Sequence, residues 1–348
     1  MVEGSYAAQY ASNRGFPHVV SAAVDADGNA VSLWKVILAD GEAFIDGYEG
    51  KLYGDLILPD EIDGVPVAGI GDLAFEGRGF DNLVIPDSVR QIGSYAFFEN
   101  SYMSEVTIPA GVTSMGWNPF ARCALKTIRV DPANPVYVAK NGVLFDDEQK
   151  LLVAYPNEKK GEYTIPKGTL YIGESAFEWS DNITGVAIPG SVTVIGDRAF
   201  YMCQSLASVT IAKGVTEIGD SAFYDCRRLK AVTIPGSCLR IGDSAFFVCG
   251  RLQTVTLQMG VEYIGDMAFM HCDKLTKVTI PDSVMSIGDY AFSGCESLKS
   301  LSIPTSVTYI GEDAFDNFHD DLILSVRQGS YAEQYAIDNE IPYVLAAK

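Results

Sequence analysis

Hydrophobic positions in the second half of the chain recur with a fixed spacing. The phrase Ile-Gly-(Asp/Glu)-x-Ala-Phe repeats so that successive phenylalanines lie 23 residues apart, at Phe177, Phe200, Phe223, Phe246, Phe269, Phe292 and Phe315. A fixed period of this length indicates a solenoid, in which each repeat is one supersecondary unit stacked on its neighbours. Related phrases precede Phe75, Phe97 and Phe120, so the array extends toward the N-terminus.

Each repeat begins with a short apolar alternation that predicts a strand. In one coil Leu229, Val232 and Ile234 fit an L-x-x-L-x-L run, with Val232 and Ile234 on one face. The residue between them should point outward, and in stacked coils this position forms a hydroxyl ladder of Thr210, Thr233, Thr256 and Thr279. A proline such as Pro235 ends the strand, and Cys238 to Ile241 predicts a second short extended run.

The segment after the second run predicts a short helix. An acidic residue follows each Ile-Gly, as at Asp220, and should cap the first helical turn by accepting its backbone N–H groups. Ala222, Phe223 and Cys226 would then form an inward apolar stripe. The predicted fold class is therefore an α/β repeat: a leucine-rich-repeat solenoid with 23-residue coils, parallel strands on the sheet side and short helical turns opposite.

Four regions are expected along the chain. Residues 1–20 resemble the other end, because Gly4 to Ala11 matches Gly329 to Ala336 and Phe16-Pro-His-Val19 matches Ile341-Pro-Tyr-Val344. We interpret 1–20 as the terminating cap of a preceding array, which implies that the sequence begins inside a longer protein. Residues 21–66 should form an N-terminal β element, 67–320 the solenoid and 321–348 the C-terminal cap. An inserted hairpin is expected near 129–162.

Composition excludes several classes of protein. The chain has 348 residues, 48% of them hydrophobic, and a net charge of −20. Nucleic acid and anionic lipid need clustered Lys and Arg, so neither is an expected partner. No apolar run approaches the length of a membrane span, and residues 1–20 lack the basic and apolar regions of an export signal.

Cysteine spacing favours buried thiols over disulfides. Cys203, Cys226, Cys249, Cys272 and Cys295 occupy one repeat position, and Cys123 follows Phe120 in the same way. Side chains stacked in parallel suit a small hydrophobic residue better than the crossed geometry of a disulfide. The alternatives are a disulfide or a metal role, and cysteine usage leaves the redox compartment open.

No catalytic, cofactor or metal site is predicted. The three histidines, His18, His271 and His319, are far apart along a solenoid, so a histidine-based triad or multi-histidine metal site is not expected. The acidic column could hold cations such as calcium, although helix capping explains each residue singly. We expect a protein that is not an enzyme and has no cofactor.

Two surface columns are candidate binding sites. The first contains Trp179, Tyr201, Tyr224, Phe247 and Met270 on the expected helical side. It is either packing between coils or an exposed apolar strip that binds a partner. The alternative surface is the ladder of Thr210, Thr233, Thr256 and Thr279. We prefer the first because aromatic and Met side chains carry more interface energy than Thr.

These phrases carry a family resemblance. Val-Thr-Ile-Pro-x-Ser-Val, Ile-Gly-x-x-Ala-Phe and Cys-x-x-Leu, together with Ile45-Asp-Gly-Tyr-x-Gly50, Ile62-Asp-Gly64 and Asp131-Pro-Ala-Asn-Pro135, resemble the BspA-like leucine-rich repeats of bacterial cell-surface proteins. The resemblance runs from about residue 43 to the C-terminal cap. It implies a secreted or cell-surface adhesin that binds a host or matrix protein. The alternatives are a carbohydrate or cell-wall binding module and a structural spacer. Oligomeric state remains open.

Overall fold

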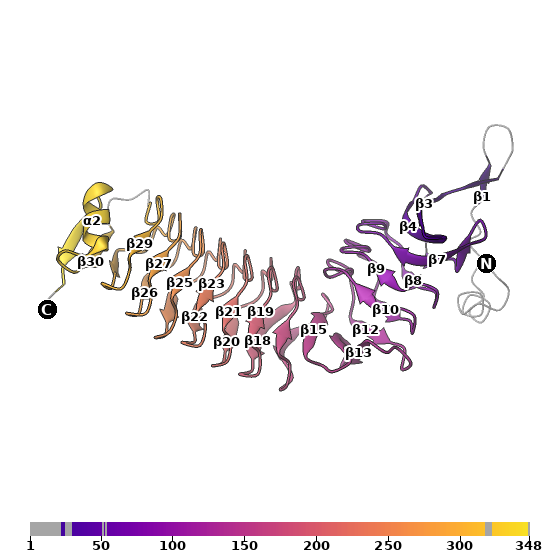
Figure 1. Ribbon diagram of the computed structural model, residues 1–348, viewed down its shortest axis with the longest axis horizontal. Coiled ribbons are helices and arrows are strands. Elements are labelled where there is room, and N and C mark those ends of the chain that lie inside the picture. Colours follow the sequence, from indigo (N-terminus) through magenta and orange to yellow (C-terminus); the bar gives the residue numbers. More distant parts are fainter. Residues whose placement is uncertain (1–21, 25–29, 51, 53, 317–321, 347–348) are drawn as a thin grey trace. The chain divides into compact units, whose positions relative to one another are not determined.

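The computed structural model describes residues 22–24, 30–50, 52, 54–316 and 322–346. The chain divides into two compact units, Met1–Lys159 and Lys160–Lys348, each of which is a stack of coils (Figure 1). Residues 1–20, expected to form the cap of a preceding array, lie outside the described residues.

The first unit begins with antiparallel strands and continues as parallel coils. Its strands are β1 (Ala22–Val24), β2 (Ala30–Ser32), β3 (Trp34–Ala39), β4 (Glu42–Tyr48), β5 (Asp55–Ile57), β6 (Glu61–Ile62), β7 (Val65–Ile70), β8 (Asn82–Val84), β9 (Gln91–Ile92), β10 (Glu105–Ile108), β11 (Ser114–Met115), β12 (Thr127–Val130), β13 (Tyr137–Lys140), β14 (Val143–Asp146) and β15 (Leu151–Ala154). β1 pairs with β2, β3 with β4 and β6 with β7, all antiparallel. β4, β7, β9 and β11 pair in parallel, as do β5 with β8 and β10 with β12.

The expected insertion forms the end of this unit. β13 pairs antiparallel with β14, and β14 with β15. The β14–β15 pair is the hairpin that the sequence predicts, with Leu144, Phe145 and Leu152 buried beneath it. An insertion that would break the repeat therefore supplies its own buried side chains.

The second unit contains the regular repeats. Its elements are β16 (Gly161–Thr164), β17 (Tyr171–Ile172), β18 (Ile183–Ile188), β19 (Val194–Ile195), β20 (Ser208–Ile211), β21 (Glu217–Ile218), β22 (Ala231–Ile234), β23 (Arg240–Ile241), β24 (Thr254–Leu257), β25 (Tyr263–Ile264), β26 (Lys277–Thr279), β27 (Ser286–Ile287), β28 (Ser300–Ser302), β29 (Tyr309–Ile310), β30 (Ile323–Val326), α2 (Tyr331–Asp338) and β31 (Tyr343–Leu345). The longer strands form three parallel groups within the described residues: β16-β18-β20, β22-β24-β26 and β28-β30-β31. The two-residue strands from β17 to β29 pair in unbroken parallel order, and each partner lies 23 residues on, as in Ile218 with Ile241.

Stacked phenylalanines fill the core of the second unit. The rings of Phe200, Phe223 and Phe246 are fully buried, with centroid separations of 4.9 Å and 5.0 Å and nearly parallel planes. The repeated Phe is therefore the core residue of each coil, as predicted. The cysteines beside them are buried free thiols, and the Sγ of Cys226 donates to the carbonyl oxygen of Phe200 at 3.3 Å.

The segment after each Ile-Gly is not helical, which makes the expected helical turns wrong. In one coil Arg198 and Met202, on either side of Phe200, have φ of 54° and 56°, and such left-handed residues interrupt an α-helix. The Phe200 N–H donates to the carbonyl oxygen of Ala222 in the next coil at 2.7 Å, whereas the Tyr201 N–H donates back to Arg198 at 2.9 Å. Alternate amides thus bond the neighbouring coil in place of a helical turn.

A helix covers the C-terminal end of the phenylalanine stack. α2 begins after Ser330, whose side chain accepts the Glu333 N–H. It buries Ala332, Tyr335 and Ala336, and the Tyr335 ring lies 6.0 Å from the ring of Phe315. This helix therefore lies over the last ring of the core and shields it from water.

Candidate interaction surfaces

The threonine ladder lies on the longer strands of the second unit and points outward. Thr210, Thr233 and Thr279 are exposed, and Thr256 is half-buried. The residues beside them on the same strands, such as Val232 and Ile234, are buried. This alternation follows the period-two geometry of a strand. The structure therefore brings Thr233, Thr256 and Thr279 together on the β22-β24-β26 sheet, and Thr210 lies on β20 of the preceding group.

The aromatic column forms a second continuous surface, along the turns. The rings of Tyr201 and Tyr224 stack at 4.7 Å, and those of Tyr224 and Phe247 at 4.9 Å. Trp179 continues the column with its ring 6.4 Å from that of Tyr201 in an edge-on orientation. All three stacked rings are half-buried, as are Trp179 and Met270. The column is thus both packing between coils and a solvent-facing strip.

Stacking determines which part of each ring a partner can reach. Offset or parallel stacking at about 5 Å uses the faces of both rings. Tyr224 has a stacked neighbour on either side, so its faces are covered and its edge and hydroxyl group remain at the surface. Binding of a sugar ring by stacking needs an uncovered aromatic face. The geometry of this column is better suited to edge-on contact with protein side chains.

Charged groups fix the N-terminal end of the aromatic column. The Arg198 guanidinium lies 4.0 Å from the Tyr201 ring centroid and pairs with the buried Glu178 carboxylate at 2.5 Å. Burial, followed by the neighbouring Tyr224, raises the pKa of the Tyr201 hydroxyl group. A second buried acid, Asp225, binds Arg227 at 2.6 Å and Gln204 at 2.9 Å. These pairs hold the turns of successive coils in one orientation.

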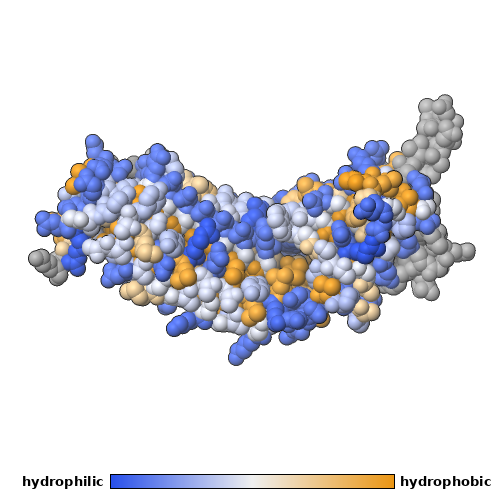
Figure 2. Space-filling model, viewed as in Figure 1, coloured by the Kyte–Doolittle hydropathy of each residue, from blue (hydrophilic) through white to orange (hydrophobic). Residues whose placement is uncertain are grey.

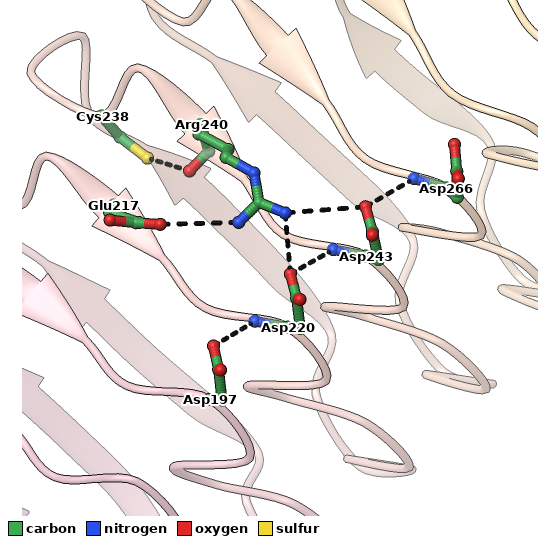
Figure 3. Close-up of polar contacts among 7 residues, drawn as sticks. All are labelled: Asp197, Glu217, Asp220, Cys238, Arg240, Asp243 and Asp266. Carbon is green, nitrogen blue, oxygen red and sulfur yellow. Dashed lines mark hydrogen bonds and ion pairs between the residues drawn. The ribbon is translucent and has the colours of Figure 1, made fainter.

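The acids that recur once in each coil have a different role from the expected helix cap. The Oδ1 atoms of Asp197, Asp220 and Asp243 each accept the backbone N–H of the acid one coil further on, at 2.8, 2.9 and 3.0 Å (Figure 3). Asp266 and Asp289 continue the ladder to Glu312. Each carboxylate therefore caps its neighbour's backbone. We call this row the Asp ladder.

The glycine before each acid allows the coils to approach this closely. A Cβ added at Gly242 would lie 2.5 Å from the carbonyl carbon of Gly219 and 2.6 Å from the backbone nitrogen of Asp220. Both of those atoms are backbone, so they cannot move aside. The Ile-Gly-Asp phrase is thus one unit, in which Gly permits contact between coils and Asp bonds across it.

Arg240 is the basic residue that forms ion pairs with the middle of the Asp ladder. Its guanidinium contacts Asp220 at 2.9 Å, Glu217 at 3.5 Å and Asp243 at 3.8 Å, from the strand side of the turn (Figure 3). Because all four side chains are roughly half-exposed, these ion pairs contribute little to stability individually. Their main effect is to neutralise the negative charge of these coils.

The comparisons with known proteins give the family. The sequence matches the BspA type Leucine rich repeat region in six copies, over residues 68–142, 154–275 and 262–325. The chain belongs to the BspA-type leucine-rich repeat family. No match is found among curated protein sequences.

Solved structures of similar fold come from several bacteria. A leucine-rich repeat protein from Eubacterium ventriosum is 32% identical, with a TM-score of 0.64 over 72% of this chain and 68% of the other. A leucine rich cell surface protein from Faecalibacterium prausnitzii is 22% identical, with a TM-score of 0.53 over 72% and 93%. The pneumococcal vaccine antigen PcpA is 15% identical, with a TM-score of 0.56 over 90% and 97%. The last two similarities establish the fold alone.

The BspA-type repeats carry little reactive chemistry in the described part of the chain. Burial raises the pKa of the Cys249 thiol, and likewise that of Cys295, to about 12, so both stay protonated and unreactive near neutral pH. No group of three or more His, Cys, Asp or Glu side chains in the described ranges is arranged to hold a metal ion. Within the same residues, no helix is long and apolar enough to cross a bilayer.

One exposed apolar surface of these repeats was missed by the sequence analysis. Leu239, Tyr263, Met285 and Tyr309, on or beside β23, β25, β27 and β29, are 37–49% exposed. On the visible face of the second unit, Figure 2 shows mostly hydrophilic or intermediate side chains with small hydrophobic patches among them. In the second extended run of each coil, two successive residues point outward between a buried Val and a buried Ile, and these two positions form the surface. Their residue types vary from coil to coil, so the repeat phrase did not show them.

Proposed function

We propose that this chain is a non-enzymatic recognition module of the bacterial cell surface or of the secreted fraction, and that it binds a host or matrix protein. The observation that supports the proposal best is the aromatic column: the rings of Trp179, Tyr201, Tyr224 and Phe247 contact one another in succession, and these rings and Met270 are half-exposed. Rings already fixed by stacking lose little conformational freedom on binding. Aromatic residues and Met are enriched in protein interfaces.

Family membership supports the class and the location. Two proteins of similar fold are described as a leucine rich cell surface protein and a pneumococcal vaccine antigen. Extended repeat surfaces bind through many weak contacts along a line and do not need a deep pocket. The threonine ladder, Thr210, Thr233, Thr256 and Thr279, is the alternative protein-binding surface. Carbohydrate binding and a spacer role are less well supported, the first because stacking covers ring faces.

The test compares two triple variants in a binding screen. Immobilised fibronectin, laminin, collagen and a glycan array are probed with the parent protein by surface plasmon resonance. Tyr201→Ser, Tyr224→Ser and Phe247→Ser together should weaken any protein interaction found by at least about tenfold, because buried aromatic contacts are typical hot spots. Thr210→Ala, Thr233→Ala and Thr279→Ala together serve as the control on the sheet face. Circular dichroism and the unfolding midpoint must show that both variants remain folded.

The two variants separate the candidate surfaces. Loss of binding in the threonine variant alone would move the site to the sheet face. Binding restricted to glycans would contradict the proposed partner class, and absence of binding to every protein and glycan would favour the spacer.

A further inference from the structure

The exposed apolar residues of β23 to β29 form one surface, which we call the tyrosine face: Leu239, Tyr263, Met285 and Tyr309. Tyr263 pairs with Ser286, and Ser286 with Tyr309, so the two tyrosines lie in one column two strands apart. The Met285 N–H donates to the Glu262 carbonyl at 2.9 Å, which places Met285 in the adjacent column. The exposed fractions are 48% for Leu239, 45% for Tyr263, 37% for Met285 and 49% for Tyr309.

This exposure is not required by packing of the core. In the coil of Met285 the core contacts come from Val284 and Ile287, which are fully buried on either side of the two outward residues. The next coil places Thr308 at the position of Met285, and Ser286 occupies the position of Tyr263 and Tyr309, so a polar residue is compatible with the fold at both outward positions. Tyr331, the first residue of α2, is also exposed at 44%. Apolar side chains of this size on a surface that tolerates Ser and Thr favour an interaction site.

The charges around the C-terminal half of the tyrosine face are all negative. Residues 261–270, 284–293 and 307–316 contain no Lys, Arg or His. They contain Glu262, Asp266, Asp289, Glu312, Asp313 and Asp316. Arg240 pairs with acids of its own and the preceding coil. The lysines of these repeats, such as the exposed Lys277 and Lys299, lie on or next to the longer strands, on the other sheet.

Two tyrosines respond to this negative field. The carboxylates of Glu312 and Asp313 raise the pKa of the Tyr290 hydroxyl group. The Asp289 carboxylate raises that of Tyr309, whose hydroxyl oxygen lies 3.4 Å from Asp289 Oδ1. Ladder hydrogen bonds to backbone N–H groups also fix the orientation of Asp266 and Asp289. The acids are therefore held in a fixed row beside the exposed rings.

We propose that the tyrosine face and its acidic border bind an extended basic segment of a partner protein. Guanidinium and ammonium groups complement the carboxylates, and they also bind the faces of tyrosine rings. Met285 and Leu239 would contact the apolar stems of the same side chains. This surface is separate from the aromatic column and adds a partner chemistry to the proposed recognition function.

The spacing of the coils defines which segment fits. Neighbouring parallel strands lie about 4.8 Å apart, so equivalent positions two coils apart, such as Tyr263 and Tyr309, are separated by roughly 9.6 Å. A polyproline II segment repeats the same face every three residues, or about 9.3 Å. A basic residue at every third position therefore matches every second coil. An extended β-strand, with a two-residue repeat of about 6.7 Å, does not match this spacing.

The probe for this proposal is a fluorescein-labelled peptide with four Arg-Pro-Pro triplets, titrated with the whole protein and followed by fluorescence anisotropy. A peptide with four Glu-Pro-Pro triplets controls for charge. A peptide of the same composition as the probe, with its four arginines contiguous, controls for spacing. We expect binding of the first peptide, weaker binding of the contiguous one and none of the acidic one. Affinity should fall as salt is raised from about 20 to 200 mM, because exposed charges are screened.

Variants locate the binding surface. Tyr263→Ser, Met285→Ser and Tyr309→Ser together should weaken binding of the Arg-Pro-Pro peptide by at least about tenfold. Glu262→Gln with Glu312→Gln should weaken it several-fold, whereas Asp282→Asn with Glu296→Gln, which makes the same change of charge at exposed positions in the same repeats, should leave it unchanged. Glu312, Asp282 and Glu296 are exposed and Glu262 is half-buried, and each substitution is close in size to the native residue, so none of them should unfold the protein.

Several outcomes would overturn the proposal. These are equal binding of the acidic peptide, unchanged binding by the tyrosine-face variant, or equal losses in the two charge variants. The face would instead be a contact between copies of this chain if sedimentation shows that the parent dimerises and the tyrosine-face variant is monomeric, and if neither protein binds the peptide. The variant of Tyr201, Tyr224 and Phe247 should bind the basic peptide like the parent. Failure of the basic-peptide test therefore leaves the aromatic-column test unaffected, and the reverse also holds.

Discussion

The Oδ1 atom of Asp266 accepts the backbone N–H of Asp289 at 2.8 Å, so a side chain of one coil satisfies a main-chain donor of the next. The same relationship joins Asp220 to Asp243 and Asp289 to Glu312. The repeated acid therefore links coils, where a helix cap would act only within one coil. Its contribution to stability can be separated from its charge.

Asp266→Ala should destabilise the protein by about 1 kcal/mol, similar to the loss of an N-cap, because the Asp289 N–H loses its acceptor. Asp266→Asn keeps an oxygen at the same position and should cost much less. Urea unfolding midpoints of the two variants measure the difference. Asp282→Ala, at an exposed position outside the Asp ladder, is the control and should be nearly neutral. Equal losses in the Ala and Asn variants would show that charge, not the hydrogen bond, is responsible.

Phe223→Ala should reduce the free energy of unfolding by about 3–5 kcal/mol, the usual range for a buried Phe. The ring has stacked neighbours, Phe200 and Phe246, at 4.9 Å and 5.0 Å, and a core one coil wide has few atoms that can collapse into the cavity. Phe247→Ala removes a half-buried ring from the next coil and should cost less than half as much. Similar losses from the two variants would contradict the assignment of Phe223 to the core.

The features that the sequence predicted correctly are those that repeat unchanged. Phe223, Cys226 and Ile241 have counterparts in the neighbouring coils. Because the period is fixed, equivalent side chains in stacked coils point the same way, and this could be predicted from the sequence. The turn was misread because Asp-x-Ala-Phe has the pattern of a capped helix, whereas Arg198 and Met202 adopt left-handed backbone and the amides of Arg198, Phe200 and Met202 bond the next coil. Hydrogen bonds between coils are tertiary contacts, and a single repeat does not contain them.

The tyrosine face was missed for the opposite reason. Its column reads Tyr171, Val194, Glu217, Arg240, Tyr263, Ser286 and Tyr309, and no residue type recurs at every coil. Only knowledge of the register shows that Tyr263 and Tyr309 lie close together. The aromatic column could be predicted because Tyr201, Tyr224 and Phe247 are chemically alike, but the stacking that covers their faces required coordinates.

The cysteines of the core should react with a thiol reagent only after unfolding. Cys226, Cys249 and Cys272 are fully buried, and each Sγ donates to a phenylalanine carbonyl of the preceding coil. Reaction with a chromogenic disulfide reagent should be slow in buffer and should reach all seven thiols in concentrated urea. Rapid modification of several thiols in the intact protein, or a Cys226–Cys249 disulfide found by mass spectrometry, would contradict this arrangement.

Stability should fall above about pH 9. Burial raises the pKa of the Cys249 thiol from 9.0 to about 12, so the unfolded chain releases this proton first as the pH rises. The unfolded state then binds fewer protons than the folded state, and the free energy of unfolding decreases as the pH rises from 9.0 to about 12. Urea midpoints at pH 8 and pH 10 measure the effect. Cys249→Ala should have a smaller decrease than the parent over this interval; an identical decrease would assign it to other groups.

Tyr335 joins the C-terminal helix to the last coil through both its ring and its hydroxyl group. The ring lies 6.0 Å from that of Phe315 in an edge-on contact, and the hydroxyl oxygen accepts the Ala314 N–H at 3.2 Å. Tyr335→Phe keeps the ring and leaves a buried donor without this acceptor, which should cost about 1–3 kcal/mol. Tyr335→Ala also uncovers Phe315 and should cost more. Tyr331→Phe changes an exposed tyrosine of the same helix and is the control.

Hydrogen exchange provides the local measurement: the Ala314 amide should exchange faster in both Tyr335 variants, while the Phe223 amide, several coils away, should be affected least. If the Ala314 amide keeps its protection in Tyr335→Phe, then the ring alone secures the helix on the last coil.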